Sequence, residues 1–216
     1  MRPAAVLTAV ALAGAPLLGA QTDTRSRLEG RVPPAIVVVV DSIIADATAH
    51  ALPTEALIQK ALEGGAKGVA GDRIVAAVQQ LSARLAAAAE AIAGAGAGRS
   101  AAAIEAGAFA LTAGLQPDDV RTLAGAAPDA VIVLRVAGTL SAIGVPRGET
   151  VALVVSTAQR EGGDLTTLPQ AVEAAMTRGA SPAQAARLAQ GGAGDRGAQP
   201  HGPPPDRPTR PKPKRP

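Results

Sequence analysis

The stretch EGGAKGV, residues 63–69, places glycines around a lysine directly after an apolar run. Such a loop can hold phosphate, because glycine lets backbone amides converge on the anion and lysine adds positive charge. The known nucleotide-binding loop reads G-x-x-x-x-G-K-[ST] between a strand and a helix. Here Lys67 is followed by Gly68, and the preceding segment has helical spacing. We therefore interpret the stretch as a joint between two helices, with Gly68 in the left-handed conformation that closes the first.

Asp46 and His50 are four residues apart, so they would share one face of a helix, as two metal ligands do. A metal site normally has three or four protein ligands, and no further His, Cys or carboxylate lies at motif spacing. We expect a side-chain contact near a helix end. The sequence predicts no metal site and no cofactor.

Several carboxylates could in principle act in acid–base chemistry. They are Glu55, Glu63, Glu105, Glu149 and the adjacent pair Asp118 and Asp119. All have the positions of surface or helix-start carboxylates, which the positive end of a helix stabilises. The chain has no cysteine and no G-x-S-x-G motif, and its only histidines are His50 and His201. The sequence argues against a familiar hydrolytic centre, and we predict no catalytic residue.

Phe109 is the only aromatic residue among 216, because Trp and Tyr are absent. Aromatic rings are the usual platforms for sugars and unstacked bases, and they are frequent anchors in protein interfaces. Carbohydrate and single-stranded nucleic-acid binding are therefore weak hypotheses. Any partner surface must be formed by small aliphatic side chains.

The first twenty residues, MRPAAVLTAVALAGAPLLGA, have the layout of a secretory signal peptide. The apolar run is shorter than the ~20 residues of a membrane-spanning helix, and Pro16 interrupts it. We expect cleavage near Ala20 and export to the periplasm or the extracellular space. No transmembrane helix is expected after cleavage, and residues 21–31 are interpreted as a polar lead-in.

Residues 191–216 combine eight prolines with six basic and two acidic side chains, which leaves residues 21–190 slightly acidic. Such a segment cannot bury a core and predicts a disordered, basic, proline-rich tail. Each basic group near an anionic lipid surface contributes about 1 kcal/mol of attraction. The candidates for this contact are Arg207, Arg210, Lys212, Lys214 and Arg215. An inert solubilising extension is the alternative interpretation.

Residues 32–190 are predicted to form one all-α domain of antiparallel helical hairpins, in a small irregular bundle or a solenoid-like array. The valine run at 37–40 prefers a strand, but the helical period continues past Asp41, so helix is favoured and strand is the alternative. Asp72 is expected to cap the helix after the glycine joint.

Three later stretches, GLQPDDV at 114, GVPRGETV at 144 and GASPAQAA at 179, each place a glycine and then a proline before a helical run. Glycine closes one helix and proline begins the next. The spacing of these units is typical of stacked helical hairpins. The apolar stripes expected to face the core are Ile132, Val136, Leu140 and Ile143; Val151, Val155 and Ala158; and Leu165, Leu168, Val172 and Met176.

The stretch LPTEALIQKALEGGAKGVAGDRIVAAV, residues 52–78, resembles a segment of uncharacterised exported bacterial proteins that are all-helical. Their shared line reads L-P-T-E-x-L-x-x-K-A-L-E-G-x-x-K-G-V and is followed by an R-I-x-x-A-V helix. The resemblance implies export and a helical fold, and it carries no activity, cofactor or ligand. It marks Lys60, Glu63 and Lys67 as a candidate surface of the domain.

These features together predict an exported, non-enzymatic helical interaction or scaffold protein of the bacterial envelope. It would bind another envelope protein, while its tail holds it near an anionic surface. An enzyme of unfamiliar type is the alternative, with Glu63, Lys67 or the Asp46 and His50 pair in a cleft between hairpins. Nucleic-acid binding through the tail is a third hypothesis, which the slightly acidic domain and the expected export disfavour.

Overall fold

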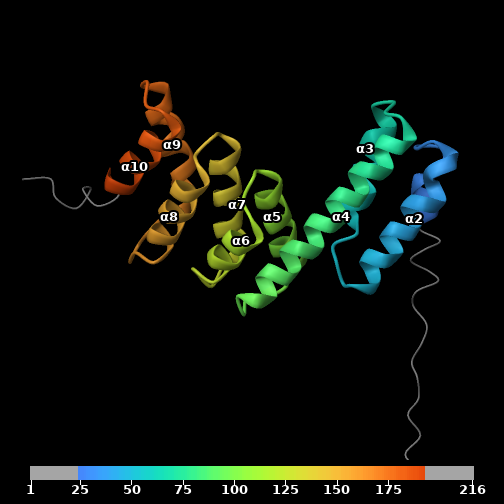
Figure 1. Ribbon diagram of the computed structural model, residues 1–216, viewed down its shortest axis with the longest axis horizontal. Coiled ribbons are helices and arrows are strands. Elements are labelled where there is room, and N and C mark those ends of the chain that lie inside the picture. Colours follow the sequence, from blue (N-terminus) through green and yellow to red (C-terminus); the bar gives the residue numbers. More distant parts are fainter. Residues whose placement is uncertain (1–23, 193–216) are drawn as a thin grey trace, which may run out of the picture.

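The structure is a computed structural model, and it describes residues 24–192. This part of the chain is helical and contains no strand, so the predicted all-α fold is confirmed (Figure 1). The helices are α2 (Pro34–Ala49), α3 (Glu55–Ala66), α4 (Gly71–Gly94), α5 (Ala101–Thr112), α6 (Pro117–Ala124), α7 (Ala130–Ala142), α8 (Arg147–Ala158), α9 (Leu168–Thr177) and α10 (Pro182–Gly192), with a 3-10 turn, Leu165–Thr167, before α9. The expected signal peptide and the five tail residues lie outside the described residues.

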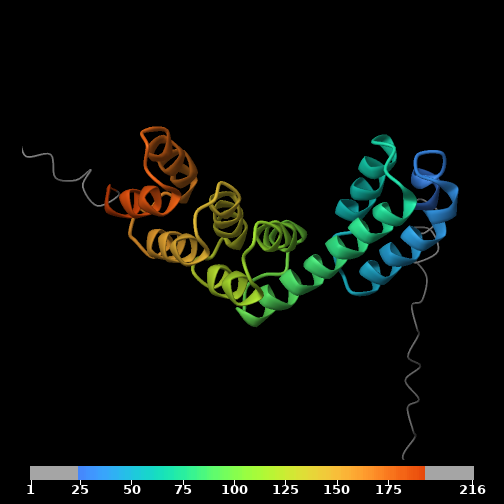
Figure 2. The same ribbon diagram turned by 45° about the horizontal axis from the view of Figure 1, so that its top comes forward.

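Successive hairpins stack side by side in a curved array (Figures 1 and 2). One layer is formed by α5, α7 and α9, which contact one another in that order. The other layer is formed by α4, α6, α8 and α10, which also contact one another in order. Figure 2 shows α5 and α7 on the inner side of the curve and α6 and α8 on its outer side. The solenoid-like arrangement is therefore the form that the predicted hairpins take.

The last three hairpins turn in the same way. Their turn glycines have positive φ angles and are Gly114 (104°), Gly144 (92°) and Gly179 (96°). The residue after each glycine donates its amide to a carbonyl five residues earlier, as Leu115 does to Ala110 at 3.1 Å. This backbone pattern closes a helix and favours glycine, because only glycine adopts such φ angles without strain. The next helix then starts at or directly after a proline, as the sequence predicts.

The EGGAKGV stretch is the end of α3 and its turn into α4. Gly68 has a φ of 65°, and the amide of Val69 donates to the carbonyl of Gly64 at 3.0 Å. The prediction of a helix joint is confirmed. The prediction that Asp72 caps α4 is wrong, because the helix begins at Gly71 and its N-cap is Ala70. Asp72 lies in the first turn, where its negative charge still faces the positive helix end.

The N-terminal part of the described chain packs on α3. Residues 24–28 are helical, and the side chain of Leu28 is fully buried, so the segment expected to be a polar lead-in contributes to the core. A Cβ atom on Gly65 would lie 2.0 Å from the carbonyl oxygen of Arg31. This glycine therefore permits the backbone before α2 to approach α3 closely.

The valine run lies in α2, which buries Val37 and Val40 and exposes Val38 and Val39. Helix rather than strand is confirmed for this run. Because four consecutive valines surround a helix, two of them necessarily point away from the core. None of the described helices is both long and apolar enough to cross a membrane.

Two of the predicted core stripes differ from the packing. Ile132 of α7 is 39% exposed, whereas Val133 and Leu134 are fully buried. In α8, Leu153 and Val154 face the core, and the valines at 151 and 155 are only half-buried. Both helices are apolar on more than one face, so helical spacing alone does not identify the face that packs inward.

Candidate functional site

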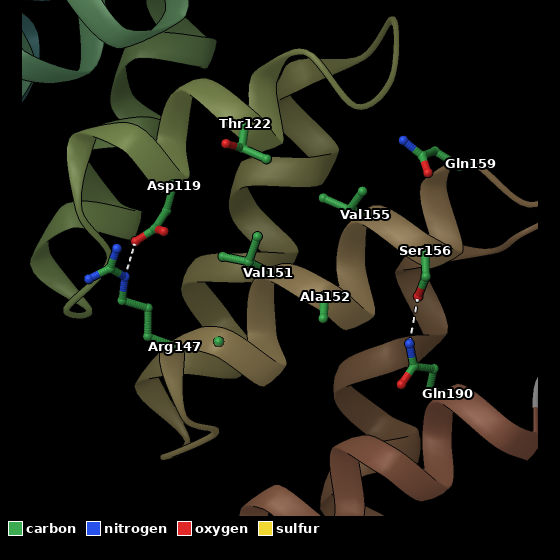
Figure 3. A pocket seen from close by; sticks show the side chains of 10 residues that line it. Asp119, Thr122, Arg147, Val151, Ala152, Val155, Ser156, Gln159 and Gln190 are labelled. Atoms are coloured by element: carbon green, nitrogen blue, oxygen red, sulfur yellow. Dashed lines mark hydrogen bonds and ion pairs between the residues drawn. The ribbon is translucent and has the colours of Figure 1, made fainter.

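A groove of about 800 Å³ lies between α6 and α8 and extends to α10 (Figure 3). Val151, Ala152 and Val155 of α8 form its apolar floor. One end is lined by Asp119 and Arg147. The other end carries the hydroxyl and amide groups of Ser156, Gln159 and Gln190. The groove thus combines an apolar centre with polar groups at both ends.

Asp119 connects two successive hairpins at the first end of the groove. It is the third residue of α6, and its carboxylate accepts the backbone amide of Gln116 at 2.7 Å. The same carboxylate pairs with Nε of Arg147, the first residue of α8, at 2.5 Å. Only 8% of Asp119 is exposed, whereas the side chain of Arg147 is 53% exposed, so the contact is shielded on the aspartate side alone. One carboxylate therefore caps its own helix and holds the start of the next hairpin's outer helix.

Glu149 also contacts the next hairpin, although it does not cap its own helix. It is the third residue of α8, and its carboxylate lies 3.4 Å from Nη2 of Arg187 on α10. Closer to the groove, Nε2 of Gln190 donates to Oγ of Ser156 at 3.2 Å (Figure 3). Helices α6, α8 and α10 are thereby linked in series by polar contacts. These contacts lie between the helices that frame the groove.

The sequence identified Asp119 and Glu149 as helix-start carboxylates, and both lie in the first turn of a helix. It missed their second role, because the arginine partners belong to other hairpins. It also missed the groove floor, since Val151 and Val155 were assigned to the core. The available signal was the surplus of apolar residues on α8 beyond those that one buried face requires.

The predicted surface residues Lys60, Glu63 and Lys67 are brought together on α3 and its turn. Nζ of Lys60 lies 3.1 Å from Oε2 of Glu63, and Nζ of Lys67 contacts Oε1 of the same carboxylate. The hydrogen bond from Lys67, followed by that from Lys60, lowers the pKa of Glu63 below its usual value. Glu63 also lines a hollow of about 590 Å³ beside Arg31 and Gln59. The cluster is an ion-pair network in which the Glu63 carboxylate pairs with two ammonium groups.

Asp46 and His50 lie at the exposed end of α2. Nδ1 of His50 is 2.8 Å from the carbonyl oxygen of Asp46 and 3.6 Å from its Oδ1 atom, which is the contact near a helix end that the spacing predicts. Both residues line a separate groove of about 680 Å³ together with Gln79 and Glu90 of α4. Within residues 24–192, no three His, Cys, Asp or Glu side chains gather closely enough to hold a metal ion.

The residues of the alternative enzymatic hypothesis do not share one site. Glu63 faces the hollow beside the N-terminal segment, whereas Asp46 and His50 face the groove between α2 and α4. Comparison with protein-family models, curated proteins and solved structures gives no match to this chain.

Proposed function

We propose that the protein is an exported, non-enzymatic helical interaction protein of the bacterial envelope. In this proposal the groove between α6 and α8 binds an extended segment of another envelope protein. The basic tail holds the complex near an anionic surface. The observation that carries the proposal is the accessible apolar floor, in which Val151 and Val155 are half-buried and Ala152 is exposed, between helices that inter-hairpin contacts link.

The chemistry of the groove supports an extended, uncharged segment with small aliphatic side chains. The charges at the first end are already paired, since Arg147 contacts Asp119, so the groove offers no unpaired charge of either sign there. Aliphatic side chains can pack on the valine and alanine floor, where burial contributes about 25 cal/mol per Å². Hydroxyl and amide groups at the other end, such as Gln159, can donate to and accept from a peptide backbone.

The described carboxylates with the clearest contacts have structural roles, which also supports an interaction protein. Glu55 receives two hydrogen bonds from Arg27, and Asp118 pairs with Arg121 at 2.9 Å. Asp119 caps α6 and joins the next hairpin. The Glu55 and Asp119 contacts join different parts of the array, whereas the Asp118 pair lies within α6.

The tail proposal rests on charge and composition. The last 26 residues carry six basic and two acidic side chains, whereas residues 21–190 are slightly acidic. Attraction to an anionic surface would therefore act through the tail, and it would weaken as salt screens the charges. The groove contact is apolar, so it should be much less sensitive to salt.

A sedimentation experiment with isolated envelope vesicles separates the two contacts. The full chain is compared with Ala152→Glu, which places a charge on the groove floor, and with a variant in which Arg207, Arg210, Lys212, Lys214 and Arg215 are replaced by Gln. Ala174→Glu on α9 is the matched control, because Ala174 is also an exposed helical alanine but lies away from the groove. Vesicles of phosphatidylglycerol and of phosphatidylcholine test the tail without any protein partner.

We expect Ala152→Glu to lose the salt-resistant fraction of the bound protein, whereas Ala174→Glu keeps it. The tail variant should lose the salt-sensitive fraction and its binding to phosphatidylglycerol vesicles. Equal sedimentation of both Glu variants at high salt would exclude the groove as the partner surface. Unchanged binding of the tail variant at low salt would exclude the tether.

A further inference from the structure

A smaller and more enclosed pocket of about 250 Å³ lies beyond the C-terminal end of α8. It is bounded by the loop after α8, the start of α9 and one residue of α10. Thr157 and Arg160 form a polar wall, and Leu168 and Ala189 form an apolar wall. The volume is that of a small organic molecule and far below that of the groove between α6 and α8.

Two polar atoms in this pocket have no hydrogen-bond partner. Thr157 is 2% exposed, and its Oγ1 atom is buried and unpaired. Nη1 of Arg160 is also buried and unpaired, three residues further along the chain. A buried polar group without a partner destabilises the folded state by about 1–3 kcal/mol, and a charged group by more. One oxygen-bearing ligand that accepts from both side chains would remove this cost.

The loop after α8 lies close against the end of that helix. A Cβ atom on Gly163 would lie 2.1 Å from the carbonyl oxygen of Thr157, so only glycine permits the loop to close over the helix end. Asp164 follows, and its Oδ1 atom accepts from the amide of Thr166 at 2.9 Å and from its hydroxyl at 2.6 Å. The carboxylate of Asp164 is thereby fixed at the rim of the pocket. Glu161 adds a second exposed carboxylate to the lining.

The charges of the lining select the kind of ligand. Arg160 is positive and requires an anionic or carbonyl oxygen, but the carboxylates of Glu161 and Asp164 repel a ligand that is only anionic. A ligand with one carboxylate and one ammonium group matches both signs. An aliphatic side chain on that ligand would contact Leu168 and Ala189.

We propose that this pocket binds a free α-amino acid with a small aliphatic side chain. Its carboxylate accepts from Arg160 and Thr157, its ammonium group faces Glu161 and Asp164, and its side chain packs on Leu168 and Ala189. This site is separate from the partner groove, so it adds a small-molecule ligand to the proposed interaction function and does not depend on it.

Isothermal titration calorimetry on the full chain tests the proposal with L-valine, L-alanine and three probes that each lack one feature. Isovalerate lacks the ammonium group, isobutylamine lacks the carboxylate, and N-acetyl-L-valine represents the carboxyl terminus of a peptide. We expect saturable binding of at least one of the two amino acids and at least about tenfold weaker binding of all three probes. No saturation by either amino acid up to about 10 mM would overturn the proposal, as would equal binding of isovalerate.

Two variants assign the binding to this pocket. Thr157→Val keeps the shape of the side chain and removes only the unpaired hydroxyl, so we expect about tenfold weaker amino-acid binding without a lower thermal midpoint. Arg160→Gln should abolish binding. Thr150→Val is the matched control, because Thr150 is also buried on α8 but donates to the carbonyl of Val145 at 3.3 Å. It should lower the thermal midpoint and leave binding unchanged, whereas unchanged binding in Thr157→Val would overturn the proposed contact.

Discussion

Phe109 of α5, the only aromatic residue of the chain, lies against Gly138 of α7. A Cβ atom at position 138 would be 2.5 Å from Cδ1 of the ring and 3.3 Å from the Cα atom of Ala110. The two helices approach closely because one of them lacks a side chain at this point. Phe109 is nevertheless 43% exposed, so one side of the ring packs at the contact between α5 and α7 and the other side faces solvent.

Gly138→Ala is therefore expected to push the ring of Phe109 aside and to separate α5 from α7. Overpacking of this kind costs about 1–3 kcal/mol, and the exposed ring has room to move, so we expect a loss near the lower end. Thermal unfolding followed by circular dichroism measures it. Gly148→Ala is the control, because a Cβ atom there meets open space. Alanine is also the better helix former, so this variant should stabilise the fold by about 0.5 kcal/mol. Equal midpoints for the two variants would contradict the close contact.

The link between Asp119 and Arg147 predicts coupling between two hairpins. Asp119→Ala removes both the cap of α6 and the ion pair, and we expect a loss of about 1–2 kcal/mol in the free energy of unfolding. Arg147→Met should cost less, because the Asp119 carboxylate keeps its backbone partner. A double-mutant cycle measured by urea unfolding should give a coupling of about 0.5–1 kcal/mol.

The neighbouring pair of Asp118 and Arg121 provides the comparison for that cycle. Asp118 has an 81% exposed side chain, and its ion pair lies within one helix. Exposed pairs of this type contribute little, so Asp118→Ala should change the free energy of unfolding by less than about 0.5 kcal/mol. If the two aspartates cost the same, the role of Asp119 between hairpins is wrong.

The glycines of the EGGAKGV stretch should differ sharply in their tolerance of alanine. Gly65→Ala places a Cβ atom 2.0 Å from the Arg31 carbonyl oxygen, a backbone atom that moves only if the N-terminal segment leaves α3. We expect a loss of at least about 2 kcal/mol. Gly68→Ala has open space but a φ of 65°, so strain alone should cost about 1 kcal/mol. Hydrogen exchange of residues 24–32 distinguishes them, since only Gly65→Ala should increase it.

The sequence predicted the features of this fold that depend on local chemistry. Turn positions such as Gly114 and Gly144 were identified because a positive φ angle requires glycine wherever the helix closes in this way. The inward face of α8 was not identified, because its valines at 151 and 155 and its core residue Leu153 are equally apolar. That choice depends on which helices pack alongside, and those contacts are distant in sequence.

The candidate sites were harder to predict than the fold, because most of them combine residues that are far apart in the sequence. Lys60, Glu63 and Lys67 contact one another because they are neighbours on one helix and its turn, which the sequence spacing already indicates. The contact of Asp119 with Arg147 required two hairpins to stack in register. The pocket beside Arg160 depended on the loop at Gly163 closing over α8, and its unpaired atoms have no sequence signature.

Glu55 gives a prediction that depends on pH. Its carboxylate accepts from Nη1 and Nη2 of Arg27 at 2.8 and 2.7 Å and from Gln59 at 2.8 Å. The hydrogen bonds from Arg27, and then that from Gln59, lower the pKa of Glu55 from 4.5 to about 2. A lowered pKa means that this contact stabilises the fold above the unfolded value near 4.5 and that the contribution is lost as pH falls towards about 2. The side chain is 58% exposed, so solvent screening limits the contribution to under about 1 kcal/mol.

The Glu55 carboxylate should therefore titrate well below the usual glutamate range when followed by carbon-detected NMR from pH 6 to 2. Arg27→Gln should return the pKa of Glu55 most of the way to 4.5, because Arg27 is the largest cause of the shift. The return should be incomplete, because the hydrogen bond from Gln59 remains. Gln59→Ala should raise the pKa by less, since its hydrogen bond is the smaller cause. The same Arg27→Gln change should weaken the hold of residues 24–28 on α3 at neutral pH and leave stability near pH 2 unaffected. A Glu55 titration near 4.5 in the unmodified chain would show that the N-terminal segment is not tied to α3 in solution.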